Sequence, residues 1–226
     1  MTSERSDASR NPQGNESTPS QSGFDIRRKD SSRPEGVGWV YLLVDCSASM
    51  EGDKFDQAKR GAAGFARDAI DKGYATGLIQ FYWSANYLSE PTRDMSMLES
   101  NIGRLKVKKV GLGEALGSLF HKWGGGTNMA EGIRLAHERL MTKTGAKAIV
   151  IITDGQPNAE GDPEKSLRAG ESAKKDRIDI ITIGTDQADQ QFLKKLASRA
   201  DLGMKVDKEN LQDAIISSVN LLSSGR

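Results

Sequence analysis

The strongest constraint on the fold is an apolar run, residues 37–44, that breaks off into small polar residues. Residues 39–44 are apolar without exception and the run carries no charge. Continuous apolarity, rather than alternation, is typical of a central parallel strand that is covered on both faces. The sequence therefore predicts a buried strand that ends at Asp45.

Three oxygen-bearing side chains follow this strand at a regular spacing. Asp45, Ser47 and Ser49 stand at positions i, i+2 and i+4. In an extended or loop backbone this spacing turns all three side chains the same way. Carboxylate and hydroxyl oxygens that converge on one point favour a hard cation, Mg²⁺ or Mn²⁺, over a metal that prefers thiolate or imidazole.

Two further stretches bring similar side chains. Residues 124–128 read Gly-Gly-Gly-Thr-Asn, a flexible turn that delivers the hydroxyl of Thr127 at the start of a predicted helix. Residues 149–155 form a second apolar run that ends in Thr153, Asp154 and Gly155. The chain therefore has a second predicted buried strand that ends in a carboxylate.

These motifs, in this order, resemble the von Willebrand factor A (VWA) family over about residues 36–224. D-x-S-x-S, a G-G-T-N turn and an apolar strand ending in T-D-G are together far more specific than any one alone. The resemblance implies a complete metal-ion-dependent adhesion site, in which the ion binds a Glu or Asp carboxylate of a partner protein. By position, its ligands correspond to Asp45, Ser47, Ser49, Thr127 and Asp154.

The remaining chain alternates strands with helices, which predicts right-handed βαβ units. We expect a Rossmann-like α/β fold: a mainly parallel six-stranded sheet with one antiparallel edge strand and helices on both faces. The Asp45 and Asp154 strands should end at the same edge, at the switch in strand order where such sheets bind ligands. Further strands are expected at 78–83, 85–88, 147–153, 178–183 and 204–206, and helices at 53–72, 94–105, 128–144, 162–175, 189–197 and 211–222.

Two segments stand apart from this pattern. Residues 1–35 are polar and are expected to be a disordered tail, either an unstructured leader or a tether or phosphorylated switch. Residues 106–123 make the connection to the G-G-T-N turn longer than in most members of the family, and their apolar residues form a stripe at helical spacing. They predict an inserted helix near the metal face, which either packs on the core or presents Trp123 and His121 to a partner.

Charge and cysteine usage limit the function classes. The chain has 32 basic and 31 acidic residues, so no basic excess points to nucleic acid. No apolar run approaches the roughly 20 residues of a membrane span, and no signal peptide is evident at the N-terminus. Cys46 is the single cysteine. These features predict a cytoplasmic protein in a reducing compartment.

The ligand set favours binding over catalysis. Three neutral hydroxyls and two carboxylates supply little negative charge to a divalent ion, so the ion keeps an open position for an anionic oxygen. The alternative is that the metal is only structural, or that no metal is bound. We expect a scaffold or adaptor module and no enzyme; the alternative is a regulatory or assembly subunit for an ATPase, kinase or phosphatase. A metal-dependent phosphohydrolase of the haloacid dehalogenase type would need D-x-D, but Ser47 stands at the second acidic position. No histidine lies near Cys46 in sequence to activate it as a nucleophile.

Overall fold

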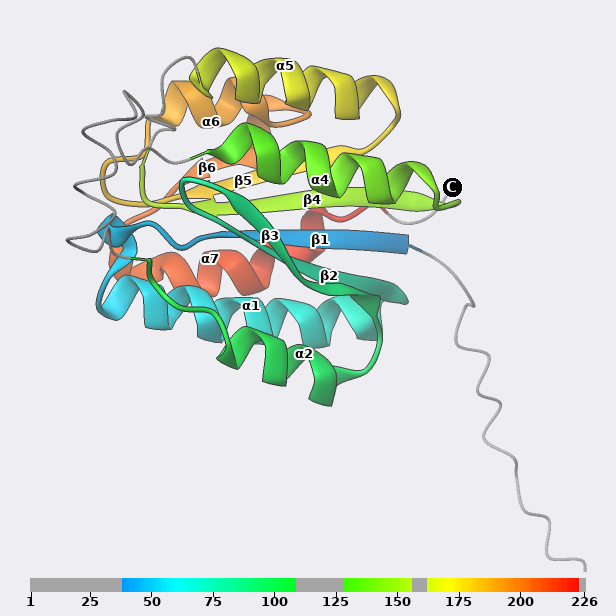
Figure 1. Cartoon of the computed structure of the whole chain (residues 1–226), viewed down its shortest axis with the longest axis horizontal. Coiled ribbons are helices and arrows are strands. Elements are labelled where there is room, and N and C mark those ends of the chain that lie inside the picture. The colour runs from blue at the N-terminus through cyan, green and yellow to red at the C-terminus, as the bar shows by residue number, and fades with distance from the viewer. Residues whose placement is uncertain (1–37, 109–127, 156–161, 224–226) are drawn as a thin grey trace, which may run out of the picture. The chain divides into compact units, whose positions relative to one another are not determined.

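The computed structural model describes residues 38–108, 128–155 and 162–223. In this part of the chain, strands form one sheet in the order β3-β2-β1-β4-β5-β6 (Figure 1). All neighbouring strands are parallel except β2 and β3. The bounds are β1 (Gly38–Asp45), β2 (Tyr74–Phe81), β3 (Ala85–Thr92), β4 (Ala146–Thr153), β5 (Asp179–Gly184) and β6 (Gly203–Lys205).

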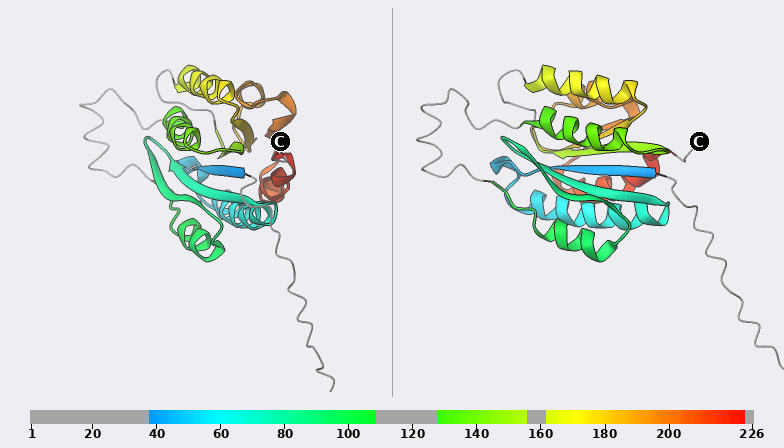
Figure 2. Two further views of the ribbon diagram at one scale, coloured as in Figure 1. Left: turned by 90° about the vertical axis from the view of Figure 1, so that its right-hand side faces the viewer. Right: turned by 45° about the vertical axis from the view of Figure 1, so that its right-hand side comes forward.

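Helices cover both faces of this sheet, as the views in Figures 1 and 2 show. One face carries α1 (Asp53–Asp71), α2 (Met95–Gly103) and α7 (Leu211–Ser217). The other face carries α4 (Met129–Met141), α5 (Asp162–Lys175) and α6 (Gln190–Leu196). The predicted Rossmann-like fold, with one antiparallel edge strand, is confirmed.

Strand β1 lies at the centre of the sheet because both of its faces are apolar. Val40, Leu42 and Val44 belong to the core on the α1 and α7 side. Tyr41 and Leu43 belong to the core on the α4 side. All five side chains are fully buried. The continuous apolar run therefore corresponds to a strand packed between two helical layers, as predicted.

Several element boundaries differ from the predicted ones. β2 begins at Tyr74 instead of residue 78. β3 continues through Pro91 to Thr92, which an edge strand tolerates because it needs no ladder hydrogen bond on its outer side. An aspartate at the start of a helical pattern predicts an N-cap at Asp53, but α1 includes Asp53 and its N-cap is Gly52, with a φ of 96°. That left-handed angle suits glycine, which has no Cβ.

Two sequence predictions fall largely outside the described residues. The tail over 1–35 lies outside them, as does most of the inserted segment. Only residues 106–108 of that segment are described, and they are not helical. The amide of Lys108 donates to the carbonyl of Cys46 at 2.8 Å, so the start of this segment is fixed beside the Asp45 loop.

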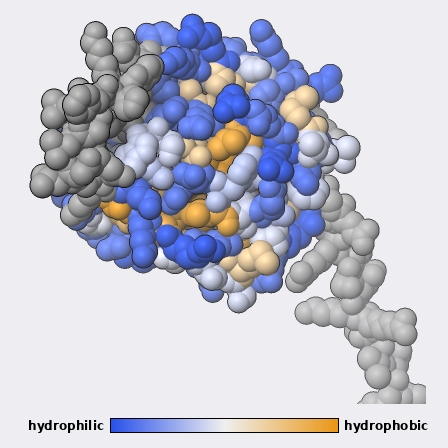
Figure 3. Space-filling model, in the orientation of Figure 1, coloured by the Kyte–Doolittle hydropathy of each residue, from blue (hydrophilic) through white to orange (hydrophobic). Residues whose placement is uncertain are grey.

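The surface in Figure 3 is mostly hydrophilic over the described residues, and apolar side chains form small separate areas. Trp83, Met97 and Met141 are the exposed large apolar side chains of the described part. On this face, charged and polar groups rather than a broad apolar patch are available to a ligand.

Candidate metal centre

The strands that carry Asp45 and Asp154 are neighbours in the sheet. β1 and β4 pair in parallel, with Val44 opposite Ile152, so both strands end at the same edge of the sheet. Strands β2 and β3 extend to one side of this pair and β5 and β6 to the other. This is the switch in strand order at which open α/β sheets bind ligands. The predicted meeting of the two loops is confirmed.

Asp45 is buried and both of its carboxylate oxygens accept hydrogen bonds. Oδ1 accepts from the amide of Ser47 at 2.9 Å, and Oδ2 accepts from the hydroxyl of Thr153 at 2.7 Å. Burial raises the pKa of Asp45 to about 6, although these hydrogen bonds oppose the rise. A cation close to Asp45 would favour the ionised carboxylate and oppose the effect of burial.

The two serines join the Asp45 loop to Asp154. The hydroxyls of Ser47 and Ser49 are 3.0 Å apart, and the Ser49 hydroxyl donates to Oδ1 of Asp154 at 2.9 Å. A short 3₁₀ turn, Ala48–Met50, sets their positions. Met50 anchors this turn because its side chain is fully buried, whereas Ser49 is exposed. Hydrogen bonds through the Ser47 amide and the two serine hydroxyls thus connect Asp45, at the end of β1, to Asp154, which follows β4.

Four of the five predicted ligand residues are therefore brought together: Asp45, Ser47, Ser49 and Asp154. Thr127 lies outside the described residues, as do the partner-binding candidates Trp123 and His121. Asn128, the residue after Thr127, is described, and its amide donates to the carbonyl of Tyr82 at 2.5 Å. The chain re-enters the described fold beside the turn between β2 and β3.

Lys54 is a member of the site that sequence reasoning missed. Its Nζ lies 2.6 Å from Oδ2 of Asp154 and 2.8 Å from Oδ2 of Asp186. Partial burial lowers the pKa of Lys54, but the hydrogen bonds to both carboxylates outweigh burial and raise it above its ordinary value. No local pattern signals this contact, because Asp53 and Asp56 in the same first turn already offset the lysine against the helix dipole.

The start of α4 is fixed by the side chains of Asp162, Asn128 and Glu131. Asp162, at the start of α5, accepts from the amides of Met129 at 3.0 Å and Ala130 at 3.3 Å. The Asn128 side chain accepts from the amide of Glu131 at 3.2 Å. The Glu131 carboxylate in turn accepts from the amide of Ala85 in β3 at 3.1 Å. The helix that follows Thr127 is thus held against both α5 and the β2–β3 turn.

Asp162 does not act as the sequence predicts. In the sequence, Asp162-Pro163 is the pattern of an N-cap followed by the first helical residue, which predicts that Asp162 caps the helix expected at 162–175. Asp162 is instead the first residue of α5, and its carboxylate caps α4. Only 2% of the residue is exposed, and burial raises its pKa above the ordinary value although the amides of Met129 and Ala130 oppose this.

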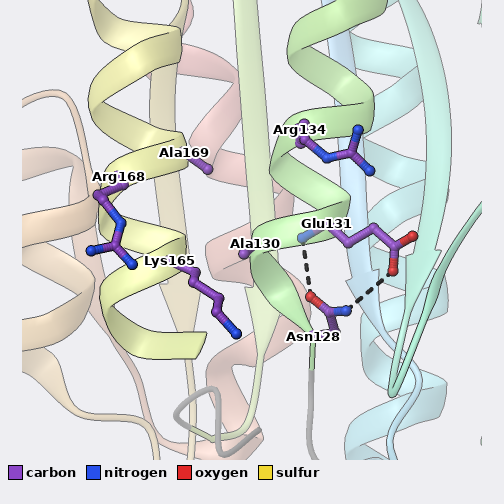
Figure 4. A pocket seen from close by; sticks show the side chains of 7 residues that line it. All are labelled: Asn128, Ala130, Glu131, Arg134, Lys165, Arg168 and Ala169. Carbon is purple, nitrogen blue, oxygen red and sulfur yellow. Dashed lines mark hydrogen bonds between the residues drawn. The ribbon is translucent and has the colours of Figure 1, made fainter. Parts of the chain in front are cut away.

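A basic pocket of about 450 Å³ lies between α4 and α5 near the same end of the helices (Figure 4). Arg134 lines it from α4, where its guanidinium pairs with Glu138 at 2.9 Å, and Lys165 and Arg168 line it from α5. Its one acidic residue, Glu131, is already held by Asn128 and by the amide of Ala85. The pocket therefore offers positive charge beside the helix that follows Thr127.

The chemistry of the site fits a hard divalent cation. Its oxygens come from carboxylates and hydroxyls, the ligands that Mg²⁺ and Mn²⁺ prefer. Among the described residues, no group of three or more His, Cys, Asp and Glu side chains is arranged to hold a metal. The serine hydroxyls are therefore essential to any ion site built from Asp45 and Asp154.

Comparison with known families agrees with this geometry. The model of the von Willebrand factor type A domain matches residues 40–217, which is most of the chain. The protein therefore belongs to the VWA family, whose members bind a divalent metal at the adhesion site and mediate protein–protein interactions. A comparison with functionally curated proteins found no match.

Solved structures share the fold at low sequence identity. Proximal thread matrix protein 1 from the mussel byssus is 16% identical with a TM-score of 0.66, over 83% of this chain and 46% of that one. The present chain thus spans less than half of the mussel protein. The vWF domain of the type V pili tip protein Mfa5 from Porphyromonas gingivalis is 14% identical with a TM-score of 0.66, over 83% and 95%. A further structure of the mussel protein, 14% identical with a TM-score of 0.61 over 83% and 47%, has a zinc-occupied adhesion motif.

The helices of the described part are too short or too polar to cross a membrane.

Proposed function

We propose that this protein is a metal-dependent protein-binding module. Asp45, Ser47, Ser49 and Asp154, together with Thr127, would hold a divalent cation, Mg²⁺ or Mn²⁺. When bound, the ion supplies a Lewis-acidic position that accepts a Glu or Asp carboxylate of a partner protein. The residues of this chain bind and orient the ion, and the partner supplies the remaining negative charge.

The observation that carries this proposal is the hydrogen-bonded connection from Asp45 through Ser47 and Ser49 to Asp154. Ser47 and Ser49 lie within hydrogen-bond distance of one another, and Ser49 reaches Asp154 from a loop 105 residues away in sequence. This arrangement gathers hydroxyl and carboxylate oxygens at an exposed edge of the sheet. A zinc-occupied adhesion motif in the mussel protein supports metal binding at this position of the fold.

The charge near the site supports an acidic partner. Arg134 of α4, the helix that follows Thr127, and Lys165 and Arg168 of α5 line the basic pocket (Figure 4). A partner with acidic residues next to its metal-binding carboxylate would be attracted by these cations, and complementary charge raises both the rate of association and its specificity. We therefore propose an acidic segment as the partner's binding element.

Binding rather than catalysis is also part of the proposal. Cys46 is fully buried, and burial raises the pKa of its thiol to about 12, so it holds its proton at neutral pH. A protonated and inaccessible thiol is a poor nucleophile.

A role as a regulatory or assembly subunit of an ATPase, kinase or phosphatase uses the same surface and differs only in which protein supplies the carboxylate. A reducing, cytoplasmic setting is proposed with it, since Cys46 is the single cysteine.

The test is capture of partners in Mg²⁺ and in EDTA, with Asp45→Asn as the matched variant. We expect the wild type to retain partner proteins in Mg²⁺ but not in EDTA, and Asp45→Asn to retain none of them. Affinity is then measured with the purified partner and with variants of its acidic residues. Equal affinity in Mg²⁺ and EDTA, for wild type and Asp45→Asn alike, would contradict binding through the metal.

A further inference from the structure

A divalent cation at this site would share the carboxylate of Asp154 with Lys54. Oδ2 of Asp154 lies 2.6 Å from the Lys54 ammonium, while Oδ1 accepts the Ser49 hydroxyl. The side chain of Lys54 is only 16% exposed, so solvent screens its charge weakly. One of the two carboxylates proposed to hold the ion is thus already partly neutralised by a fixed cation of the same chain.

The second partner of Lys54 is held in place by the backbone. Asp186 has a φ of 49°, in the left-handed region that residues with a Cβ rarely adopt. The turn around it is fixed to the end of β4, because Thr185 donates to the carbonyl of Thr153 at 3.1 Å and Gln187 to that of Asp154 at 3.0 Å. Such conformations persist where the surrounding structure enforces them, often at functional sites. The Asp186 carboxylate therefore faces Lys54 from a rigid turn.

We propose that Lys54 sets the metal affinity of this site. Its ammonium repels a divalent cation held by the Asp45 and Asp154 loops, and Asp186 moderates that repulsion by sharing the positive charge. The ion then binds weakly to the free protein, and a carboxylate from the partner adds the negative charge that makes binding tight. This inference rests on the proposed function, since it assigns a role to Lys54 at the same site.

The test is Mn²⁺ affinity of the full chain, measured by electron paramagnetic resonance of the free ion at neutral pH. Lys54→Met should bind Mn²⁺ about tenfold more tightly than wild type, because a like charge close to the ion has been removed. Lys54→Arg keeps the charge and should bind like wild type. Asp186→Asn should bind more weakly, because the remaining ammonium is then shared with Asp154 alone.

Arg67→Met is the matched control. It removes one positive charge from the same helix at an exposed site about 20 Å along α1, where its partner is Glu99. Its Mn²⁺ affinity should equal that of wild type, because solvent and salt screen charges at that distance. The melting temperature of every variant is measured without metal, so that a loss of folding is not read as a loss of binding.

Two results would overturn the inference while leaving the proposed function intact. In the first result, wild type binds Mn²⁺ and Asp45→Asn does not, but folded Lys54→Met binds Mn²⁺ with an affinity equal to or lower than that of wild type. The second, which applies even if Lys54→Met fails to fold, is equal or tighter binding by Asp186→Asn. No binding by any of the folded variants, Lys54→Met included, would overturn the proposed function together with the inference.

Discussion

The carboxylate of Asp162 accepts a hydrogen bond from the backbone amide of Met129 at 3.0 Å, so the first residue of α5 caps the start of α4. The same carboxylate accepts from the next amide, that of Ala130, at 3.3 Å. A negative charge at a helix N-terminus is favoured by unsatisfied amides and by the helix dipole. This contact therefore fixes the helix whose preceding residues include Thr127, the predicted ligand outside the described residues.

Removing this cap should destabilise the fold. Asp162→Ala leaves the Met129 and Ala130 amides without their acceptor in a buried position, and should lower the free energy of unfolding by about 1–3 kcal/mol. Urea unfolding measures the change. Asp201→Ala is the control, because Asp201 is exposed and its ion pair is with nearby Arg199, so its loss should cost about 0.5 kcal/mol or less. Equal stability of both variants would contradict a capping role for Asp162.

The same residue predicts a pH dependence of stability. Burial raises the pKa of Asp162 above its ordinary value of 3.8, although the amides of Met129 and Ala130 oppose the rise. The folded state therefore holds this proton more tightly than the unfolded state. Its contribution favours folding below pH 3.8 and is lost as the pH rises through the raised pKa. Subtracting the unfolding free energy of Asp162→Asn from that of wild type should give a difference that falls as the pH increases from 3.8, and a rising difference would contradict the assignment.

One glycine in the sheet and one in a helix provide a matched test of packing. A Cβ at Gly77 would overlap the ring of Tyr41, and that ring is held by a hydrogen bond from its hydroxyl to Glu90 at 2.9 Å. Gly77→Ala should therefore lower the free energy of unfolding by about 1–3 kcal/mol. At Gly103, in the last turn of α2, a Cβ meets no atom within 4 Å. Gly103→Ala should leave stability unchanged or raise it by up to about 1 kcal/mol, as thermal or urea unfolding will show.

The basic pocket predicts how partner binding depends on charge. Arg168→Glu reverses one exposed charge in the pocket and should weaken the binding of an acidic partner about tenfold at low salt, and less at high salt. Arg67→Glu reverses an exposed charge on α1 and should have no effect. The measurement is affinity for a partner captured in Mg²⁺, at several salt concentrations. Identical affinity and salt dependence for the two variants would exclude the pocket from the interface.

Local patterns in the sequence predicted the sheet and the meeting of the two loops that carry the proposed ligands. The apolar runs that end at Asp45 and Asp154 specify two buried parallel strands, and parallel strands end at the same edge. Asp189 was expected to open a helix, and its side chain does cap α6 by accepting from the amides of Gln191 and Phe192. In these cases the residues that decide the structure lie close together in sequence.

Contacts between distant segments were not predicted, for a physical reason. Lys54 and Asp186 are 132 residues apart, and only the finished sheet brings the start of α1 to the turn after β5. Asp162 could cap its own helix or another, and local spacing does not distinguish the two. The strand limits of β2 and β3 also depend on pairing, since β3 is an edge strand with shifts in register against β2.

The most direct test of the metal site is anomalous diffraction from crystals grown in Mn²⁺. We predict one peak within coordination distance of the Ser47 and Ser49 hydroxyls, at the edge of the sheet where β1 and β4 end. The same map shows whether Thr127 contributes a ligand and how Lys54 is placed when the ion is bound. The peak should be absent from crystals of Asp45→Asn grown in the same way. A wild-type map at saturating Mn²⁺ with no peak at the serines, or with its peak elsewhere on the protein, would contradict the assignment of this edge as the metal centre.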